Sequence, residues 1–236
     1  MYYYIILFYK SKKNFMLNNM NSDKLEINSD KRIFVFRLFF AVLGWITFLI
    51  AQIFSILDTS LPWLYRIFGS YRFFTIQTNI MVLAWLSLAL ISYFKPNLLH
   101  KLVGVLKGAF TLYISITFIV FAIFLSIFYT PTGFEAFSNI VFHYITPIVF
   151  IIDWILTEKV KYKWKFLLFW LIYPVCYLCF AICYGTFTGD YIYFFLNINA
   201  LGIPTFLMSF CVLVVFFLVI GVMYIGINRK WLSEKE

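Results

Sequence analysis

Six long apolar runs, separated by short polar connections, constrain this chain more than any other feature. A helix needs about 20 residues to cross about 30 Å of hydrocarbon, and each run is close to that length. None of the runs alternates polar with apolar residues, as the strands of a membrane barrel would. The sequence therefore predicts an all-α polytopic transmembrane helix bundle of six spans. The predicted spans are 33–57, 73–94, 108–129, 140–157, 166–185 and 203–227, of which the fourth is the shortest.

The composition agrees with a single membrane domain. Of the 236 residues, 64% are hydrophobic and 12% are charged, whereas about 25% of the residues in a soluble domain are charged. We expect a cytosolic, partly disordered N-terminal segment over 1–32, a transmembrane domain over 33–227 and a cytosolic tail over 228–236. Membrane lipid is then both the solvent of the protein and a candidate substrate, and no protein partner is identified.

The distribution of lysine and arginine predicts the orientation of the spans. The first connection contains Arg66 and Arg72 and the third and fifth contain no cation, whereas both ends and the other connections are basic. Cytosolic loops carry the excess of Lys and Arg, so we predict that both termini are cytosolic and that the chain resides in the cell membrane. We expect Arg37 to extend back to the cytosolic side. The cations that set this orientation are Lys10, Lys12, Lys13, Lys24, Lys31, Arg32, Lys95, Lys101, Lys107, Lys159, Lys161, Lys163, Lys165, Arg229, Lys230 and Lys235.

The net charge of +9 and the 23% aromatic residues do not indicate nucleic-acid binding. A nucleic-acid-binding protein gathers its cations on one polar surface, whereas here they lie between apolar runs. This function is therefore excluded.

The four cysteines are interpreted as small packing residues. Cys176, Cys179 and Cys183 share one face of the fifth span, and Cys211 lies in the sixth. Their spacing gives no metal site, and the sequence indicates no cofactor.

Polar residues inside the spans are functional candidates, because unpaired polar groups are costly in hydrocarbon. The second span opens with FFTIQTN, in which Thr75, Thr78 and Asn79 lie at i, i+3 and i+4 and share one helix face. The structural alternative is that these side chains join neighbouring helices by hydrogen bonds.

His143 is the second candidate, about one turn inside the predicted start of the fourth span. Asn139 lies four residues earlier, so either Asn139 or Glu135 could orient the imidazole ring. Pro147 has no N–H to give to the His143 carbonyl, which weakens the helix there. The alternative is again a hydrogen-bonded structural histidine.

Asp153 is the third candidate, ten residues beyond His143. That separation is about 15 Å along a helix, too far for direct contact with the imidazole. We expect Asp153 to pair with a cation or a tyrosine near the inner face, or to line an ion pathway.

The predicted topology relates the first two candidates. The second and fourth spans both run inward, so Thr75 and His143 are expected at similar depth, each near the outer N-terminus of a helix. Free N–H groups at such an end can stabilise an oxyanion. A hydroxyl, a base and these donors are the minimum set for acyl transfer.

These stretches resemble the androgen-induced and androgen-dependent family of multi-pass membrane hydrolases and related bacterial six-span proteins. The shared features are Phe73, Phe74 and Thr75 opening one span, and His143, Pro147 and Asp153 in a later one. The resemblance implies hydrolysis of fatty-acid esters, with Thr75 as nucleophile and His143 as base.

The leading hypothesis is therefore an intramembrane Thr/His-dependent lipid esterase, in which Asn79 or Asn139 positions the reacting groups. The first alternative is a small-solute or proton-coupled transporter that uses Asp153 and His143. The second is a non-catalytic assembly protein, in which the polar groups only hold helices together.

Overall fold

The computed structural model describes the backbone of residues 2–95 and 103–234, and the side chains of 30–95 and 105–234. The described chain is mostly helical, with no strand, and six of its helical segments are long and apolar enough to cross a membrane. The prediction of an all-α, six-span bundle is thereby confirmed, and the chain is an integral multi-pass membrane protein. Lys101 and Lys235, and the side chains of the lysines before Asp30, lie outside the described residues.

Within the described ranges there are eight α-helices and five short 3-10 or π turns, and the six segments contain all of these α-helices except α2, which lies in the first connection. The α-helices are α1 Tyr2–Leu57, α2 Trp63–Phe68, α3 Phe74–Phe94, α4 Val103–Val120, α5 Gly133–Ile140, α6 Thr146–Thr157, α7 Phe166–Thr188 and α8 Ile198–Ser233. The short turns are η1 Gly69–Arg72, η2 Phe121–Leu125, η3 Ser126–Phe128, η4 Val141–Ile145 and η5 Phe194–Leu196.

At the ends of the chain, one predicted boundary differs and one agrees. The backbone of α1 is helical from Tyr2 and its membrane-spanning part begins at Asp30, close to the predicted start at 33, while the partly disordered cytosolic character expected of 1–32 stays a prediction. Helix α8 continues to Ser233, beyond the predicted end of the last span at 227. Near its start, Gly202 adopts φ +69° just before Pro204, so the regular part of α8 begins close to the predicted position.

The fourth span begins earlier than predicted. It runs from Gly133 to Thr157, as α5, η4 and α6 in succession, instead of 140–157. Thr132 is extended and Gly133 has φ +58°, a geometry that suits glycine and starts α5 there. The polar residues Glu135, Ser138 and Asn139 make this first part look like a loop, although a helix end at the membrane surface accommodates them.

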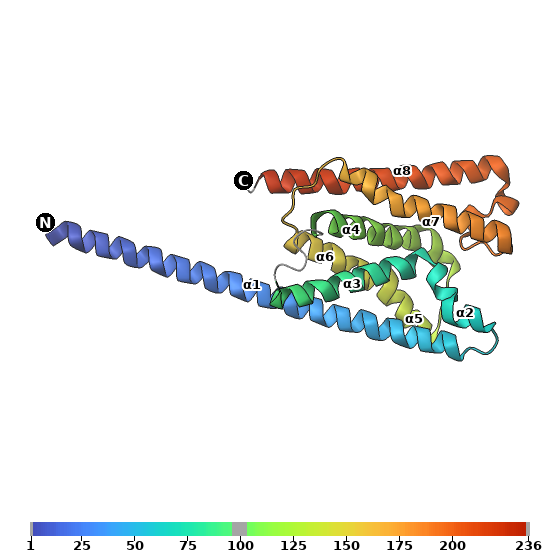
Figure 1. Ribbon diagram of the computed structural model, residues 1–236, viewed down its shortest axis with the longest axis horizontal. Helices are drawn as coiled ribbons and strands as arrows, with labels where there is room; N and C mark the ends of the chain where they lie inside the picture. The colour runs from blue at the N-terminus through green and yellow to red at the C-terminus, as the bar shows by residue number, and fades with distance from the viewer. Residues whose placement is uncertain (1, 96–102, 235–236) are drawn as a thin grey trace.

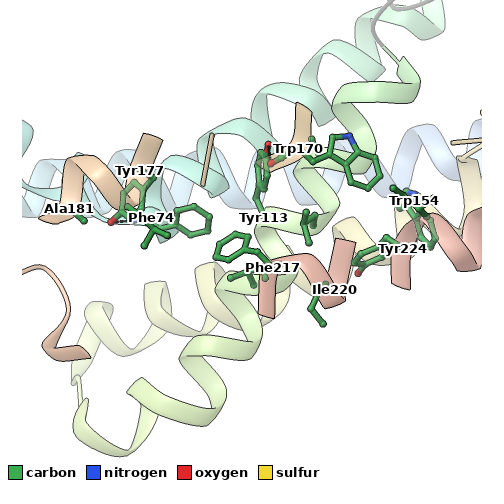
Figure 2. Close-up of a cluster of buried hydrophobic side chains, with 14 of the residues drawn as sticks. Phe74, Tyr113, Trp154, Trp170, Tyr177, Ala181, Phe217, Ile220 and Tyr224 are labelled. Carbon is green, nitrogen blue, oxygen red and sulfur yellow. Dashed lines mark hydrogen bonds between the residues drawn. The ribbon is translucent and has the colours of Figure 1, made fainter. Parts of the chain in front are cut away.

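Helix α4 lies at the centre of the bundle and contacts α3, α6, α7 and α8. Figure 1 shows α7 and α8 along one side of the molecule and α1 and α3 along the other, with α4 between them. The main buried cluster joins α4, α7 and α8 through large aromatic side chains, and Figure 2 shows Phe74 beside Tyr177 at one end of this cluster. Phe74 is the residue before Thr75, so the core fixes the backbone from which the Thr75 side chain projects.

Candidate functional site

Thr75 and His143 are in direct contact. The Thr75 hydroxyl oxygen lies 3.2 Å from His143 Nε2, within the range of a hydrogen bond. Thr75 is in the first turn of α3 and His143 is in η4, so the contact joins the second and fourth spans. The expectation that these two side chains face each other is confirmed, and the two spans are neighbours. The role of the pair in chemistry stays a prediction.

The other ring nitrogen of His143 determines how the pair is polarised. His143 Nδ1 lies 3.1 Å from the backbone carbonyl oxygen of Asn139, and a carbonyl oxygen can only accept. The proton of a neutral ring is therefore on Nδ1, which leaves Nε2 as the acceptor of the Thr75 O–H. This is the tautomer that a general base needs.

The orienting group differs from the predicted one. Asn139 holds the imidazole through its backbone carbonyl and not through its side chain, whose oxygen is buried without a hydrogen-bond partner among the described residues. Glu135 instead accepts a hydrogen bond from Tyr129. The i to i+4 spacing brought Asn139 to the right place, but the sequence cannot show whether main chain or side chain makes the contact.

Two π-helical turns face each other at the site. In η4 the N–H of Thr146 bonds to the carbonyl of Val141 across five residues, and in η2 the N–H of Ser126 bonds to Phe121 in the same way. The Phe121 ring stacks on the imidazole of His143, with ring centroids 3.7 Å apart. Such turns are rare and occur frequently at functional sites. The weak point expected at Pro147 is thus a π turn just before it.

Asn79 ties the two halves of the site together. Its side-chain nitrogen donates to the Thr75 carbonyl at 2.8 Å and to the Phe142 carbonyl at 3.0 Å. One amide therefore fixes the backbone at Thr75 and next to His143, as expected of a positioning residue. Thr78 faces a different neighbour, because its hydroxyl bonds to that of Thr117 on α4 at 2.9 Å.

Two tyrosines complete the site, and sequence analysis missed both. The N–H of Phe74 donates to the hydroxyls of Tyr177, at 2.9 Å, and Tyr193, at 3.2 Å. The Tyr193 hydroxyl also interacts with the Thr75 side chain. Tyr177 lies on α7 and Tyr193 in the extended segment after it, so no local pattern around Thr75 could have revealed them.

The position of the helix ends contradicts one part of the prediction. His143 lies ten residues after the start of α5, about 15 Å along the helix, so this helix presents no free N–H group beside the imidazole. The first N–H of α3 is already bonded to the two tyrosine hydroxyls. The donor expected at a helix end beside His143 is therefore not found, whereas for the N–H groups that follow Phe74 at the start of α3 the expectation stays a prediction.

A small cavity of about 50 Å³ adjoins Thr75. Thr75, Thr117, Tyr177 and Tyr193 carry hydroxyl groups in its lining, and its other walls are mainly apolar side chains of α3, α4, α7, α8 and the segment around η5. The apolar walls include Phe74, Ile116, Val120, Leu178, Leu213 and Phe217. An apolar space that ends at a nucleophilic hydroxyl suits a lipid chain better than a water-soluble substrate.

Asp153 belongs to a separate ionic cluster. Its carboxylate lies 2.6 Å from Arg37 Nε and 3.0 Å from Lys107 Nζ, and both cations also bond to the Thr157 hydroxyl. The expected cation partner of Asp153 is confirmed. Lys107, assigned from sequence to a cytosolic loop, is instead 2% exposed inside the bundle, because Asp153 compensates its charge.

The cysteines do not pack in the core. Cys176, Cys179, Cys183 and Cys211 carry free thiols and are all exposed on the outside of the bundle, so their interpretation as packing residues is wrong. Among the described residues, no group of three or more His, Cys, Asp or Glu side chains is arranged to hold a metal ion.

Comparison with known proteins identifies no relative. No family model, curated protein or solved structure matches this chain.

Proposed function

We propose that this protein is an intramembrane hydrolase of lipid esters, with Thr75 as the nucleophile and His143 as the general base. The observation that carries the proposal is the 3.2 Å contact between the Thr75 hydroxyl and His143 Nε2, together with the carbonyl that holds Nδ1. Nucleophile, base and orienting group then form the arrangement that covalent catalysis uses. The proposal includes membership of the androgen-induced and androgen-dependent family of membrane hydrolases, which the sequence resembles.

The reaction proceeds in two stages. Thr75 Oγ1 attacks the ester carbonyl carbon while its proton passes to His143 Nε2, and the imidazole then returns this proton to the departing alcohol. Water attacks the resulting acyl-threonine, gives a proton to His143, and releases the fatty acid as Thr75 regains its proton. One ester and one water yield one acid and one alcohol.

The surroundings support a lipid substrate. The reacting pair lies within two membrane-spanning segments, and the adjoining cavity is mainly apolar. A lipid ester can reach such a site laterally from the bilayer. If both termini are cytosolic, α3 begins at the outer side of the bilayer, and Thr75 in its first turn would lie toward the outer leaflet.

Replacement of the pair tests the proposal. Purified protein in lipid nanodiscs is treated with a fluorophosphonate probe, and hydrolysis of a fluorogenic long-chain ester is measured in parallel. We expect Thr75→Val and His143→Ala to abolish both labelling and hydrolysis, and Thr75→Ser to keep part of each. Full hydrolysis by both of the first two variants would overturn the mechanism.

Thr47→Val is the matched control for this experiment. Thr47 is also a buried threonine of a membrane-spanning helix, but its hydroxyl bonds to the Leu43 carbonyl within α1 and not to His143. This variant is expected to keep labelling and turnover. Equal losses in Thr47→Val and Thr75→Val would indicate a packing defect instead of a lost nucleophile.

A further inference from the structure

The Tyr177 and Tyr193 hydroxyls accept a hydrogen bond from the same N–H group, but their own protons have different acceptors. The N–H of Phe74 donates to both oxygens. Tyr177 donates its own proton to the Arg72 carbonyl at 2.9 Å, so this proton is committed to the backbone just before α3. Tyr177 therefore holds the start of the helix in place.

The Tyr193 hydroxyl has two side-chain oxygens beside it that can accept its proton. It interacts with the side chains of Tyr177 and Thr75, and the proton of Tyr177 is already donated to the Arg72 carbonyl. Because Thr75 gives its proton to His143 Nε2, the Thr75 oxygen can only accept from Tyr193. Burial raises the pKa of Tyr193 above its ordinary value, so the phenol keeps its proton at neutral pH and remains a donor.

A substrate carbonyl that Thr75 attacks would occupy the cavity beside Tyr193. Thr75 and Tyr193 both line it, and a carbonyl oxygen is one bond away from the carbon that Thr75 attacks. A donor beside the nucleophile therefore lies within reach of the oxygen on which negative charge develops. In a mainly apolar surrounding a hydrogen bond to that charge is stronger than in water.

We propose that Tyr193 is a catalytic residue whose hydroxyl donates a hydrogen bond to the oxyanion formed when Thr75 attacks an acyl chain seated in this cavity. This inference rests on the proposed function. As the new C–O bond forms, the π electrons of the carbonyl move to its oxygen and the Thr75 proton moves to His143. Tyr193 keeps its proton throughout and only changes the acceptor of its hydrogen bond to the oxyanion. It takes the place of the donor that the sequence analysis expected at the helix end beside His143.

The test compares Tyr193→Phe with the unaltered protein in the nanodisc ester assay. Loss of one oxyanion donor lowers kcat by about 100- to 1,000-fold in known acyl-transfer enzymes. We expect a loss of about 100-fold in kcat, little change in KM, and slower labelling by the fluorophosphonate. Turnover of Tyr193→Phe within twofold of the unaltered protein, with normal folding, would overturn the inference.

Tyr173→Phe is the matched control. Tyr173 also lies among the buried aromatic residues of α7, but its hydroxyl bonds to Gln77 at 2.8 Å and does not touch Thr75. We expect its kcat to remain within twofold. Equal losses in both tyrosine variants would mean that any buried hydroxyl matters through packing, which contradicts the specific role of Tyr193.

A second variant covers the case in which Tyr193→Phe does not fold. Replacement of Tyr193 by 3,5-difluorotyrosine keeps the ring and hydroxyl but makes the phenol more acidic. Because ionisation removes the donated proton, the fall of kcat at alkaline pH should shift to lower pH. An unshifted pH profile would overturn the inference.

Failure of this inference is distinguishable from failure of the proposed function. If Thr75→Val abolishes labelling but Tyr193→Phe turns over normally, only the role of Tyr193 is wrong. If Thr75→Val retains labelling and hydrolysis, the assignment of Thr75 as nucleophile is wrong, and the role inferred for Tyr193 is then also wrong.

Discussion

Lys107 Nζ lies 3.0 Å from Asp153 Oδ2 within the bundle, and Arg37 donates to both oxygens of the same carboxylate, from Nε to Oδ1 at 2.6 Å and from Nη2 to Oδ2 at 3.2 Å. The three residues come from α4, α6 and α1, so one buried carboxylate joins three helices. Lys107 also reaches the Asp153 backbone carbonyl at 3.2 Å. Asp153 lies ten residues after His143 in the same membrane-spanning segment, and the cluster holds that segment against α1 and α4.

Asp153→Asn is expected to destabilise the protein strongly. The substitution leaves the buried Lys107 ammonium without its nearest counter-charge, and breaking a buried ion pair costs about 3–5 kcal/mol. Unfolding in mixed detergent, followed by circular dichroism, measures the loss. Lys159→Gln removes an exposed charge from the following loop and should change stability little. The double variant Lys107→Met with Asp153→Asn should recover part of the loss; no recovery would show that Asp153 acts through another partner.

Asn79→Leu is expected to reduce hydrolysis while the protein still folds. Asn79 donates to the Thr75 and Phe142 carbonyls, so its loss frees the two segments that hold the reacting pair. Interhelical hydrogen bonds in membranes contribute about 1 kcal/mol each, so the stability loss should be small. We expect kcat to fall by about tenfold or more, since a small displacement of the reacting groups lowers the rate steeply.

Ser92→Ala is the control for Asn79→Leu. It removes a hydroxyl that is bonded within α3 itself and should leave the rate unchanged. Unchanged turnover in Asn79→Leu would exclude a positioning role.

Gly108→Ala is expected to separate α4 from α7. A Cβ at position 108 would lie 2.3 Å from Trp170 Cζ2 and 2.9 Å from Tyr162 Cζ, so these rings would have to move. Overpacking of this kind costs about 1–3 kcal/mol, measurable as a lower thermal midpoint in detergent. Gly226→Ala is the control, because a Cβ there would meet nothing within 4 Å in the described part of the chain. Equal thermal midpoints of the two variants would mean that the close approach at Gly108 does not contribute to stability.

Sided labelling of introduced cysteines tests the predicted orientation. The four native cysteines are exposed on the bundle, so a variant with alanine at all four positions provides the background. Thr132→Cys and Lys159→Cys then place single thiols at exposed positions in the connections before and after the fourth span. With cytosolic termini, a membrane-impermeant maleimide should label intact cells only at position 132. Both thiols should react after permeabilisation, and labelling of intact cells at 159 alone would mean the reverse orientation.

Hydropathy along the chain is enough to predict the number and approximate position of the spans. Hydrophobic length is a local property, because each helix satisfies its own backbone hydrogen bonds and must match the bilayer thickness. The start of the fourth span was missed because Glu135, Ser138 and Asn139 continue the helix through polar residues. The sequence also singled out Thr75, Asn79, His143 and Asp153, since polar groups within spans require partners.

Which of these polar groups contact one another depends on how the helices pack. Thr75 and His143 are 68 positions apart, and hydropathy does not reveal which face of one apolar helix contacts another. For the same reason, the sequence analysis does not identify Tyr193 as a site residue and places Lys107 in a loop. The physical reason is that lipid and protein interior are almost equally apolar, so in a membrane the directional hydrogen bonds and ion pairs, together with close packing such as that at Gly108, determine the arrangement of the helices.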